Sequence, residues 1–338
     1  MKRFRWSRKK LWYWLLASTA LGASFGLAGC GLQKNGLIVV VDDACRARVI
    51  ASSRDGFATP DAVHWDGQRL LIADEGGHGI AVRSTDRAFH QLVGPQQGVQ
   101  SPEDLVIDAD GNIYFTDDDA GGVWRLTTDG KLSVLAGKDD GLQSTEGIAL
   151  ADNGHLLVGD GVAHAIFDIA PDGRVSVFLG PEAGIQKPES LVFDGQGNLY
   201  IADNVLNVVF RLDKSGELRK LITARDGLTQ PESLCFQGDA LYITDDEAGK
   251  LYRYTPSEGL KTLAVFAGQL KNLQGITAGP EGSLLLTVQD LRHHQGLIIQ
   301  FWRSPETAVA TDAIPPSTVP MRGDSSGAVE ASPSKLRT

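Results

Sequence analysis

Residue types that support several common chemistries are scarce in this chain of 338 residues. There are only three Cys and two Met, and aromatic residues make up 7%. The sequence has no zinc-ligand spacing, nucleophile elbow, phosphate loop or dinucleotide fingerprint. Serine-type catalysis therefore has no support, and two cysteines beyond residue 30 make no disulfide framework. Cys235 lies in an apolar strand pattern, so we predict a small buried thiol there rather than a bridge to Cys45.

Positive charge is also in short supply, with 32 Lys and Arg against 42 Asp and Glu. Six of the basic residues lie in residues 1–29, which contain no acid, so the rest of the chain carries a net charge of −16. Phosphate binding requires clustered Lys and Arg on the surface. The composition therefore excludes a nucleic-acid partner.

The first thirty residues have the pattern of an export signal. A basic segment precedes the apolar residues 11–26, which are too few for a membrane span of roughly 20 residues. Leu27-Ala28-Gly29-Cys30 then resembles the bacterial lipobox. The resemblance implies removal of residues 1–29 and acylation of Cys30, which would anchor the chain in the lipid bilayer of the cell envelope through a tether over 30–35. The absence of an acid at Gly31 favours the outer membrane if the bacterium has two membranes. A plain secretory signal with an incidental Cys is the alternative.

A unit of about 43 residues is repeated six times in the body of the chain. Its marker is a string such as Lys187-Pro188-Glu189-Ser190-Leu191, and successive copies are 42 or 43 residues apart. Within one copy we predict four short strands, over 191–193, 199–202, 208–212 and 218–222. Gly and Asn between them supply the positive φ that tight turns need.

Six such antiparallel units predict an all-β protein, a six-bladed β-propeller over residues 36–303. A solenoid is the competing architecture, but it carries capping units and none is evident. The last unit offers only three strands, so we expect the N-terminal run 37–41 or 48–51 to supply its fourth strand and close the ring. Residues 304–338 are rich in Pro, Ser, Thr and Ala and are predicted to be a disordered tail.

The repeat places an acid or amide near the start of every innermost strand. In a propeller these strands line the central channel, so five carboxyl groups and one amide should converge on one axis: Asp61, Glu103, Glu146, Glu189, Glu232 and Gln274. Oxygen ligands from several strands suit Ca²⁺, whereas zinc has no His or Cys at this position. The alternative, about equally weighted, is that copying one unit has copied its Glu.

The loops between second and third strands should open on the same face of the propeller. They contribute further polar residues to the channel mouth, namely His78, Asp118, His164, Asn204, Asp246 and His293. A neutral imidazole near a metal can act as a base, but any single His is more simply a solvated loop residue. We expect the Asp that begins each loop, such as Asp203, to cap a turn by accepting backbone hydrogen bonds.

The strings PESLVFDGQGNLYIADN and SPEDLVIDADGNIYFTDD resemble the superfamily of six-bladed calcium propellers. Gluconolactonase (senescence marker protein), strictosidine synthase and paraoxonase belong to it, and proteins with NHL repeats share the strings. Carried over from gluconolactonases, the resemblance implies metal ligands at Asp61, Glu146, Glu189 and Glu232, with Glu232 as the catalytic base. Those enzymes have one Glu, two Asn and one Asp there, whereas this chain has four acids and adds Glu103.

Two functions follow from this resemblance. One is hydrolysis of a lactone or ester substrate with the help of Ca²⁺, although the extra negative charge would weaken the Lewis acidity of the metal. An acidic mouth would favour neutral or cationic small molecules. The other is a non-enzymatic, NHL-type binding module on the cell envelope that presents its loops to a protein partner.

Overall fold

The computed structural model describes residues 38–40, 45–84, 88–290 and 295–303. Predicted features in 1–37 and 304–338, including the signal segment, Cys30 and the tail, lie outside the described residues. Residues 1–304 and 305–338 form separate units, of which only the first contains described residues. The described part is all-β, and its only helices are turns of three residues. None of its helices is long and apolar enough to cross a membrane.

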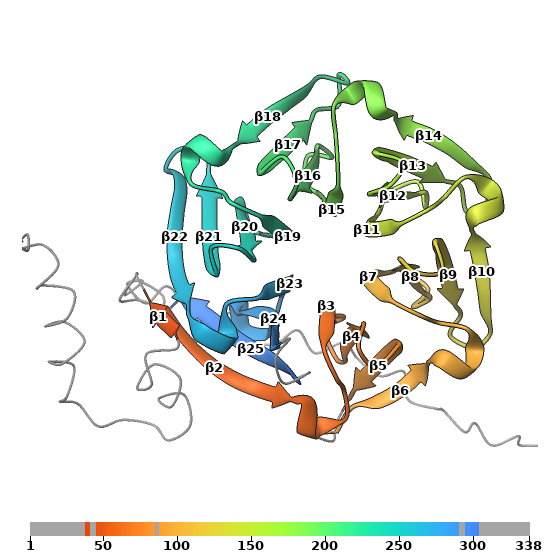
Figure 1. Ribbon diagram of the computed structural model, residues 1–338, viewed down its shortest axis with the longest axis horizontal. Coiled ribbons are helices and arrows are strands. Elements are labelled where there is room, and N and C mark those ends of the chain that lie inside the picture. Colours follow the sequence, from red (N-terminus) through yellow and green to blue (C-terminus); the bar gives the residue numbers. More distant parts are fainter. Residues whose placement is uncertain (1–37, 41–44, 85–87, 291–294, 304–338) are drawn as a thin grey trace, which may run out of the picture. The chain divides into compact units, whose positions relative to one another are not determined.

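Six sheets are arranged around a central axis as the blades of a β-propeller (Figure 1). Each blade is numbered here by its order along the chain, and its strands run from the axis outward. Blade 1 comprises β3 Pro60–Trp65, β4 Leu70–Asp74, β5 Gly79–Arg83 and β6 His90–Val93. Blade 2 comprises β7 Pro102–Ile107, β8 Ile113–Asp117, β9 Gly122–Leu126 and β10 Leu132–Ala136. Blade 3 comprises β11 Thr145–Leu150, β12 Leu156–Asp160, β13 Ala165–Ile169 and β14 Val175–Leu179.

The remaining blades follow the same antiparallel plan. Blade 4 comprises β15 Pro188–Phe193, β16 Leu199–Asp203, β17 Val208–Leu212 and β18 Leu218–Ile222. Blade 5 comprises β19 Pro231–Gln237, β20 Ala240–Asp245, β21 Lys250–Thr255 and β22 Gly259–Phe266. Blade 6 comprises β23 Leu273–Ala278, β24 Leu284–Asp290 and β25 Gln295–Arg303. Short 3-10 turns join the elements: η1 Ser53–Asp55, η2 Pro95–Gln97, η3 Lys138–Asp140, η4 Pro181–Ala183, η5 Ala224–Asp226, η6 Gly268–Leu270 and η7 Pro280–Gly282.

The N-terminal part of the chain closes the propeller. Strand β2, Cys45–Ser52, pairs antiparallel with β25 and forms the outer strand of blade 6, as predicted for the segment 48–51. The other candidate, 37–41, has a different place, because β1 Ile38–Val40 pairs with β22 and adds a fifth strand to blade 5. Closure by β2 covers the edge of β25, which would otherwise present unpaired backbone groups.

The local sequence explains the tight turns at the end of the innermost strands. In blade 4 the Asp194 carboxylate accepts hydrogen bonds from the backbone of Gln196 and Asn198 and from the Asn198 amide, at 2.7–2.9 Å. Gly197 has a φ of 78°, a left-handed conformation that favours glycine. The same Asp–Gly–Asn pattern recurs in the corresponding turn of blade 2.

The hydrophobic core lies between neighbouring blades. The second strands of blades 1, 3 and 4 are buried along their whole length, whereas the outer strands are largely exposed. Cys45 and Cys235 belong to one apolar cluster, and they form no disulfide. The prediction of a small buried thiol rather than a bridge is therefore confirmed, and burial raises the pKa of the Cys235 thiol to about 12.

Candidate functional site: a ring of carboxyl groups

The predicted ring exists. The second residue of each innermost strand is Asp61, Glu103, Glu146, Glu189, Glu232 or Gln274, and all six line one cavity on the propeller axis. The cavity has a volume of about 20 Å³, which is room for a single water molecule or ion. An organic substrate therefore cannot enter the ring and has to bind above it, among the loops.

An interruption in strand pairing orients each ring residue. In every blade the register of the innermost strand shifts just where the acid or amide lies, for example between Pro188 and Ser190 in blade 4. A bulge leaves its extra residue outside the hydrogen-bonded ladder and changes the direction of its side chain. The innermost strands also begin about three residues earlier than predicted, so the ring residues are part of the strands.

The carboxyl groups of the ring are paired with one another. Glu103 lies close enough to Asp61, and Glu189 to Glu146, for the repulsion between their charges to raise the pKa of Asp61 and of Glu146. Burial, reinforced by neighbouring acids, raises the pKa of Glu103 to about 7 and that of Glu146 to about 9. The pKa values of Asp61, Glu189 and Glu232 are raised as well, again chiefly by burial.

An ammonium group that sequence analysis missed lies beside the ring. The Nζ atom of Lys187 is 2.7 Å from Glu189 Oε1 and 3.3 Å from Glu146 Oε1. Burial acts to lower the pKa of Lys187, but the attraction of Glu189 and Glu146 outweighs it and the net shift is upward. The signal was present in the repeat, because the residue before this strand is uncharged in the other five copies: Thr59, Ser101, Ser144, Gln230 and Asn272.

The absence of a side chain at Gly161 provides the room for Lys187. A Cβ atom on Gly161 would lie 2.9 Å from both Glu146 Oε1 and the Lys187 side chain. In the other blades the equivalent residue carries a polar side chain. It directly follows the second strand in four of them and lies one residue before the end of β24 in blade 6: Glu75, Asp118, Asn204, Asp246 and Gln289. Gly161 and Lys187 thus act together, since the lysine of blade 4 fills the space left open by blade 3.

Two amides bridge further carboxyl groups. Asn204, predicted at the mouth, donates to Glu189 and, at 3.3 Å, to Glu232. Gln289 donates to Asp61 at 3.0 Å and to Glu75 at 3.3 Å. Gln289 was not among the predicted residues, because the sixth copy of the second repeat string is degraded and hides its equivalence to Asn204.

The two predicted aspartates of the mouth differ in environment. Asp118 accepts a hydrogen bond from the Ser144 hydroxyl. Asp246 is half-buried, and burial raises its pKa to about 6. Its Oδ1 atom is buried and has no hydrogen-bond partner among the described residues. An orphaned carboxylate oxygen of this kind is a ready ligand for a cation.

The two predicted histidines that the structure describes, His78 and His164, lie on loops and do not line the ring. His78 and His164 both have a φ of 53°, and a ring nitrogen of each bonds a backbone carbonyl of the loop that precedes the next blade, that of Gln100 or Gln186. This contact explains them as loop residues that link neighbouring blades. His293 and its neighbour His294 lie outside the described residues.

The loop aspartates cap turns, as predicted. Asp74, Asp117, Asp160, Asp203 and Asp245 each accept backbone hydrogen bonds from the segment before the innermost strand of their own blade. Each therefore fixes the segment that leads into a ring residue. Their part in the site is to position the acids.

The donor set of the ring fits a hard cation. Carboxylate and amide oxygens from several strands are the ligands that Ca²⁺ accepts, the cavity is large enough for one ion, and Asp246 offers an unpaired oxygen. In the described ranges no three His, Cys, Asp or Glu side chains are arranged as a metal cluster. The donors that contact the ring acids are the Lys187 ammonium group, the Asn204 and Gln289 amides and the Ser101 and Ser144 hydroxyls.

Fold and site together define a six-bladed propeller with an acidic channel mouth. A family model described as the SMP-30/gluconolactonase/LRE-like region matches residues 34–247. The chain therefore belongs to this family. No curated protein matches it.

Solved structures share the fold at low sequence identity. A gluconolactonase from Xanthomonas campestris superimposes with a TM-score of 0.61 at 15% identity, over 78% of this chain and 94% of that one. A streptogramin B lyase gives a TM-score of 0.60 at 14% identity, over 76% and 97% of the two chains. An auxiliary nutrient binding protein from Bacteroides thetaiotaomicron gives 0.58 at 15% identity, over 78% and 76%. Identities this low support the propeller and not an activity.

Proposed function

We propose that the protein is a hydrolase of lactones or esters that depends on a divalent cation, with Ca²⁺ as the favoured ion. The observation that carries this proposal is the convergence of five carboxyl groups on one ion-sized cavity. Asp61, Glu146, Glu189 and Glu232 would hold the ion. When bound, Ca²⁺ would supply polarisation of the substrate carbonyl and stabilisation of the developing oxyanion.

Glu232 is our candidate for the general base. Burial, followed by repulsion from Glu189, raises the pKa of Glu232 without an ion, and a bound cation would favour the ionised carboxylate that a general base requires. Asn204 donates to Glu232 Oε2 and so orients the carboxylate. The acidic residues at the mouth repel anionic substrates, which favours a neutral lactone or ester.

A calcium titration of chelator-stripped protein by calorimetry tests the site. We expect saturable binding that Glu189→Gln weakens at least about tenfold, because a ligand charge is lost. Glu217→Gln, an exposed change on a turn at the other face, is the matched control. Calcium-dependent hydrolysis of a panel of neutral lactones and esters should be lost in Glu232→Gln. Absence of calcium binding by the unaltered protein would refute the metal site.

One observation favours a non-enzymatic binding module as the second candidate. Lys187, Asn204 and Gln289 already satisfy much of the ring without an ion. This candidate predicts no turnover of any lactone or ester, with or without calcium. It also predicts that a small molecule or an envelope protein is retained by the loops of the mouth.

We further propose that the protein works at the cell envelope, anchored through lipid on Cys30. The support is the sequence Leu27–Cys30 with its basic and apolar flanks. Labelling of cells with an alkyne-bearing fatty acid should modify the unaltered protein and not Cys30→Ser. Equal labelling of the two would refute the anchor.

A further inference from the structure

A second cavity opens between blades 4 and 5, away from the ring. Its volume is about 690 Å³, within the range of small-molecule sites. It lies beside the turn Asp194–Asn198, which follows β15, whereas the ring residue Glu189 lies at the start of that strand. The cavity is therefore at the opposite end of the blade. It is independent of the proposed metal site.

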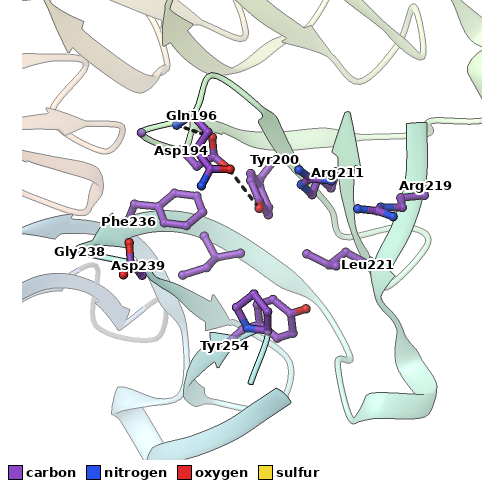
Figure 2. Close-up of a pocket in the computed structure, with 13 residues that line it drawn as sticks. Asp194, Gln196, Tyr200, Arg211, Arg219, Leu221, Phe236, Gly238, Asp239 and Tyr254 are labelled. Atoms are coloured by element: carbon purple, nitrogen blue, oxygen red, sulfur yellow. Dashed lines mark hydrogen bonds between the residues drawn. The ribbon is translucent and has the colours of Figure 1, made fainter. Parts of the chain in front are cut away.

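The cavity has one cationic wall and one aromatic wall (Figure 2). Tyr200, Arg211 and Arg219 are direct neighbours on β16, β17 and β18 of blade 4. Blade 5 contributes Phe236 and Tyr254, and the Phe236 ring packs edge-on against Tyr200 with their centroids 4.9 Å apart. The turn Gly238–Asp239 of blade 5 has only two residues, so it covers less of the groove than the five-residue turn of blade 4.

Two guanidinium groups directly opposite each other repel, and such pairs normally have a counter-ion. Arg211 lies over the Tyr200 ring, 6.0 Å from its centroid. In the part of the chain that the structure describes, neither Arg211 nor Arg219 has a carboxylate within 4 Å, and the Asp213 carboxylate acts on Arg211 only at longer range. The two guanidinium groups therefore face the cavity without a carboxylate at ion-pair distance, although Asp194 and Asp239 line other parts of it.

In blade 5, a carboxylate neutralises the two cations at the equivalent pair of positions. There Arg253 and Lys261 are opposite each other on β21 and β22, at the places of Arg211 and Arg219. The Glu258 carboxylate bridges them, bonding Arg253 and, at 2.7 Å, Lys261. Blade 4 has two cations in the equivalent arrangement but no such bridge, and it has an open cavity instead.

We propose that this cavity binds a small monocarboxylate with an aromatic or alicyclic body. The ligand carboxylate would lie between Arg211 and Arg219, as Glu258 does between the cations of blade 5, and its body would pack against Phe236 and Tyr254. Arginine side chains form charge-assisted and often bidentate hydrogen bonds with carboxylates. Aromatic walls favour a planar apolar body.

The rim of the cavity limits the ligand to one negative charge. Asp194 and Asp239 lie there, and Asp194 is fixed by three N–H groups and, at 3.3 Å, by the Tyr200 hydroxyl. A second carboxylate on the ligand would meet these acids. We therefore expect dicarboxylates to bind more weakly than monocarboxylates of the same length.

Calorimetric titration with hydrocinnamate, a phenyl ring on a propionate chain, tests the proposal on the full chain with chelator present. We expect saturable binding in the millimolar range or tighter. The neutral hydrocinnamamide should bind at least about tenfold more weakly, since it lacks the charge that Arg219 pairs. Because chelator removes divalent ions, this result does not depend on the function proposed for the ring.

Three variants define the site. Arg219→Gln should weaken hydrocinnamate binding about tenfold or more, and Arg219→Lys should weaken it less. The matched control is Arg174→Gln, an exposed arginine between the outer strands of blade 3 that pairs with Asp172. Melting temperatures verify that the variants are folded. No saturable binding, equal binding of acid and amide, or equal binding by Arg219→Gln and Arg174→Gln would each overturn the proposal.

Discussion

Replacement of Lys187 by methionine is expected to strengthen calcium binding. The change keeps most of the apolar stem of the side chain but removes the ammonium group that bridges Glu146 and Glu189. In the unaltered protein that group both repels a divalent cation and occupies two of its proposed ligands. Its removal therefore raises the negative charge available to an ion.

The structure sets the size of the effect. Lys187 Nζ is 3.3 Å from Glu146 Oε1, so a calcium ion bound to that oxygen at about 2.4 Å would lie within about 6 Å of the ammonium group. The Lys187 side chain is 37% exposed, so solvent screens it and a water-like dielectric constant gives the lower limit. At that distance, repulsion between charges of two and one is about 1.4 kcal/mol, or tenfold in affinity.

Calorimetry at several salt concentrations measures this effect. We expect a Kd for calcium at least about tenfold lower in Lys187→Met, with a difference that shrinks at high salt because screening weakens the repulsion. Lys214→Met removes the same charge from an exposed turn at the other end of blade 4 and should leave the Kd unchanged. Equal or weaker binding by Lys187→Met would refute the electrostatic reasoning.

Two other predictions concern stability. Burial raises the pKa of Glu146 to about 9 in the folded protein. The contribution of Glu146 to folding stability is therefore complete below its ordinary pKa of 4.5 and is lost as the pH rises through about 9. We therefore compare the melting temperatures of Glu146→Gln and the unaltered protein without calcium. As the pH rises from about 5 to 9, the melting temperature of the variant should increase relative to that of the unaltered protein. A difference in melting temperature that does not change with pH would contradict this prediction. Asp203→Ala removes the acceptor of the Gln186 and Leu206 N–H groups, and urea unfolding should show a loss of about 1–3 kcal/mol. Asp172→Ala, a change at an exposed aspartate, is the control for Asp203→Ala. Equal midpoints of urea unfolding for these two variants would contradict the capping role of Asp203.

Much of the fold follows from the repeat. Three of the four strand predictions for blade 4 agree with the structure to within one residue, because Gly and Asn turns mark their ends. The start of the innermost strand was missed, since Pro188 and Glu189 look like loop residues and the bulge that admits them has no simple sequence signature. Both N-terminal segments have strand character, and only their pairing with β22 or β25 distinguishes them.

The acids of the ring were predictable because five of the six copies of the repeat contain one at the same position and the sixth has Gln274. Their charge state was not, because it depends on contacts between different blades. Lys187 belongs to blade 4 but lies over Glu146 of blade 3, and its place there requires a glycine at position 161. Gln289 bridges the last blade to Asp61 of the first, a contact between residues 228 positions apart.

The asymmetry of these contacts has a consequence for where an ion would bind. Lys187 compensates Glu146 and Glu189 on one side of the ring. On the other side, Glu232 has only the Asn204 amide as a side-chain partner in the described part of the chain. The orphaned Asp246 oxygen belongs to the same blade as Glu232. Since the ammonium group repels a cation, we expect an ion that contacts the four proposed ligands to lie toward the Glu232 side of the ring, with Glu146 as its more distant ligand. That position would bring the ion to the residue proposed as the base.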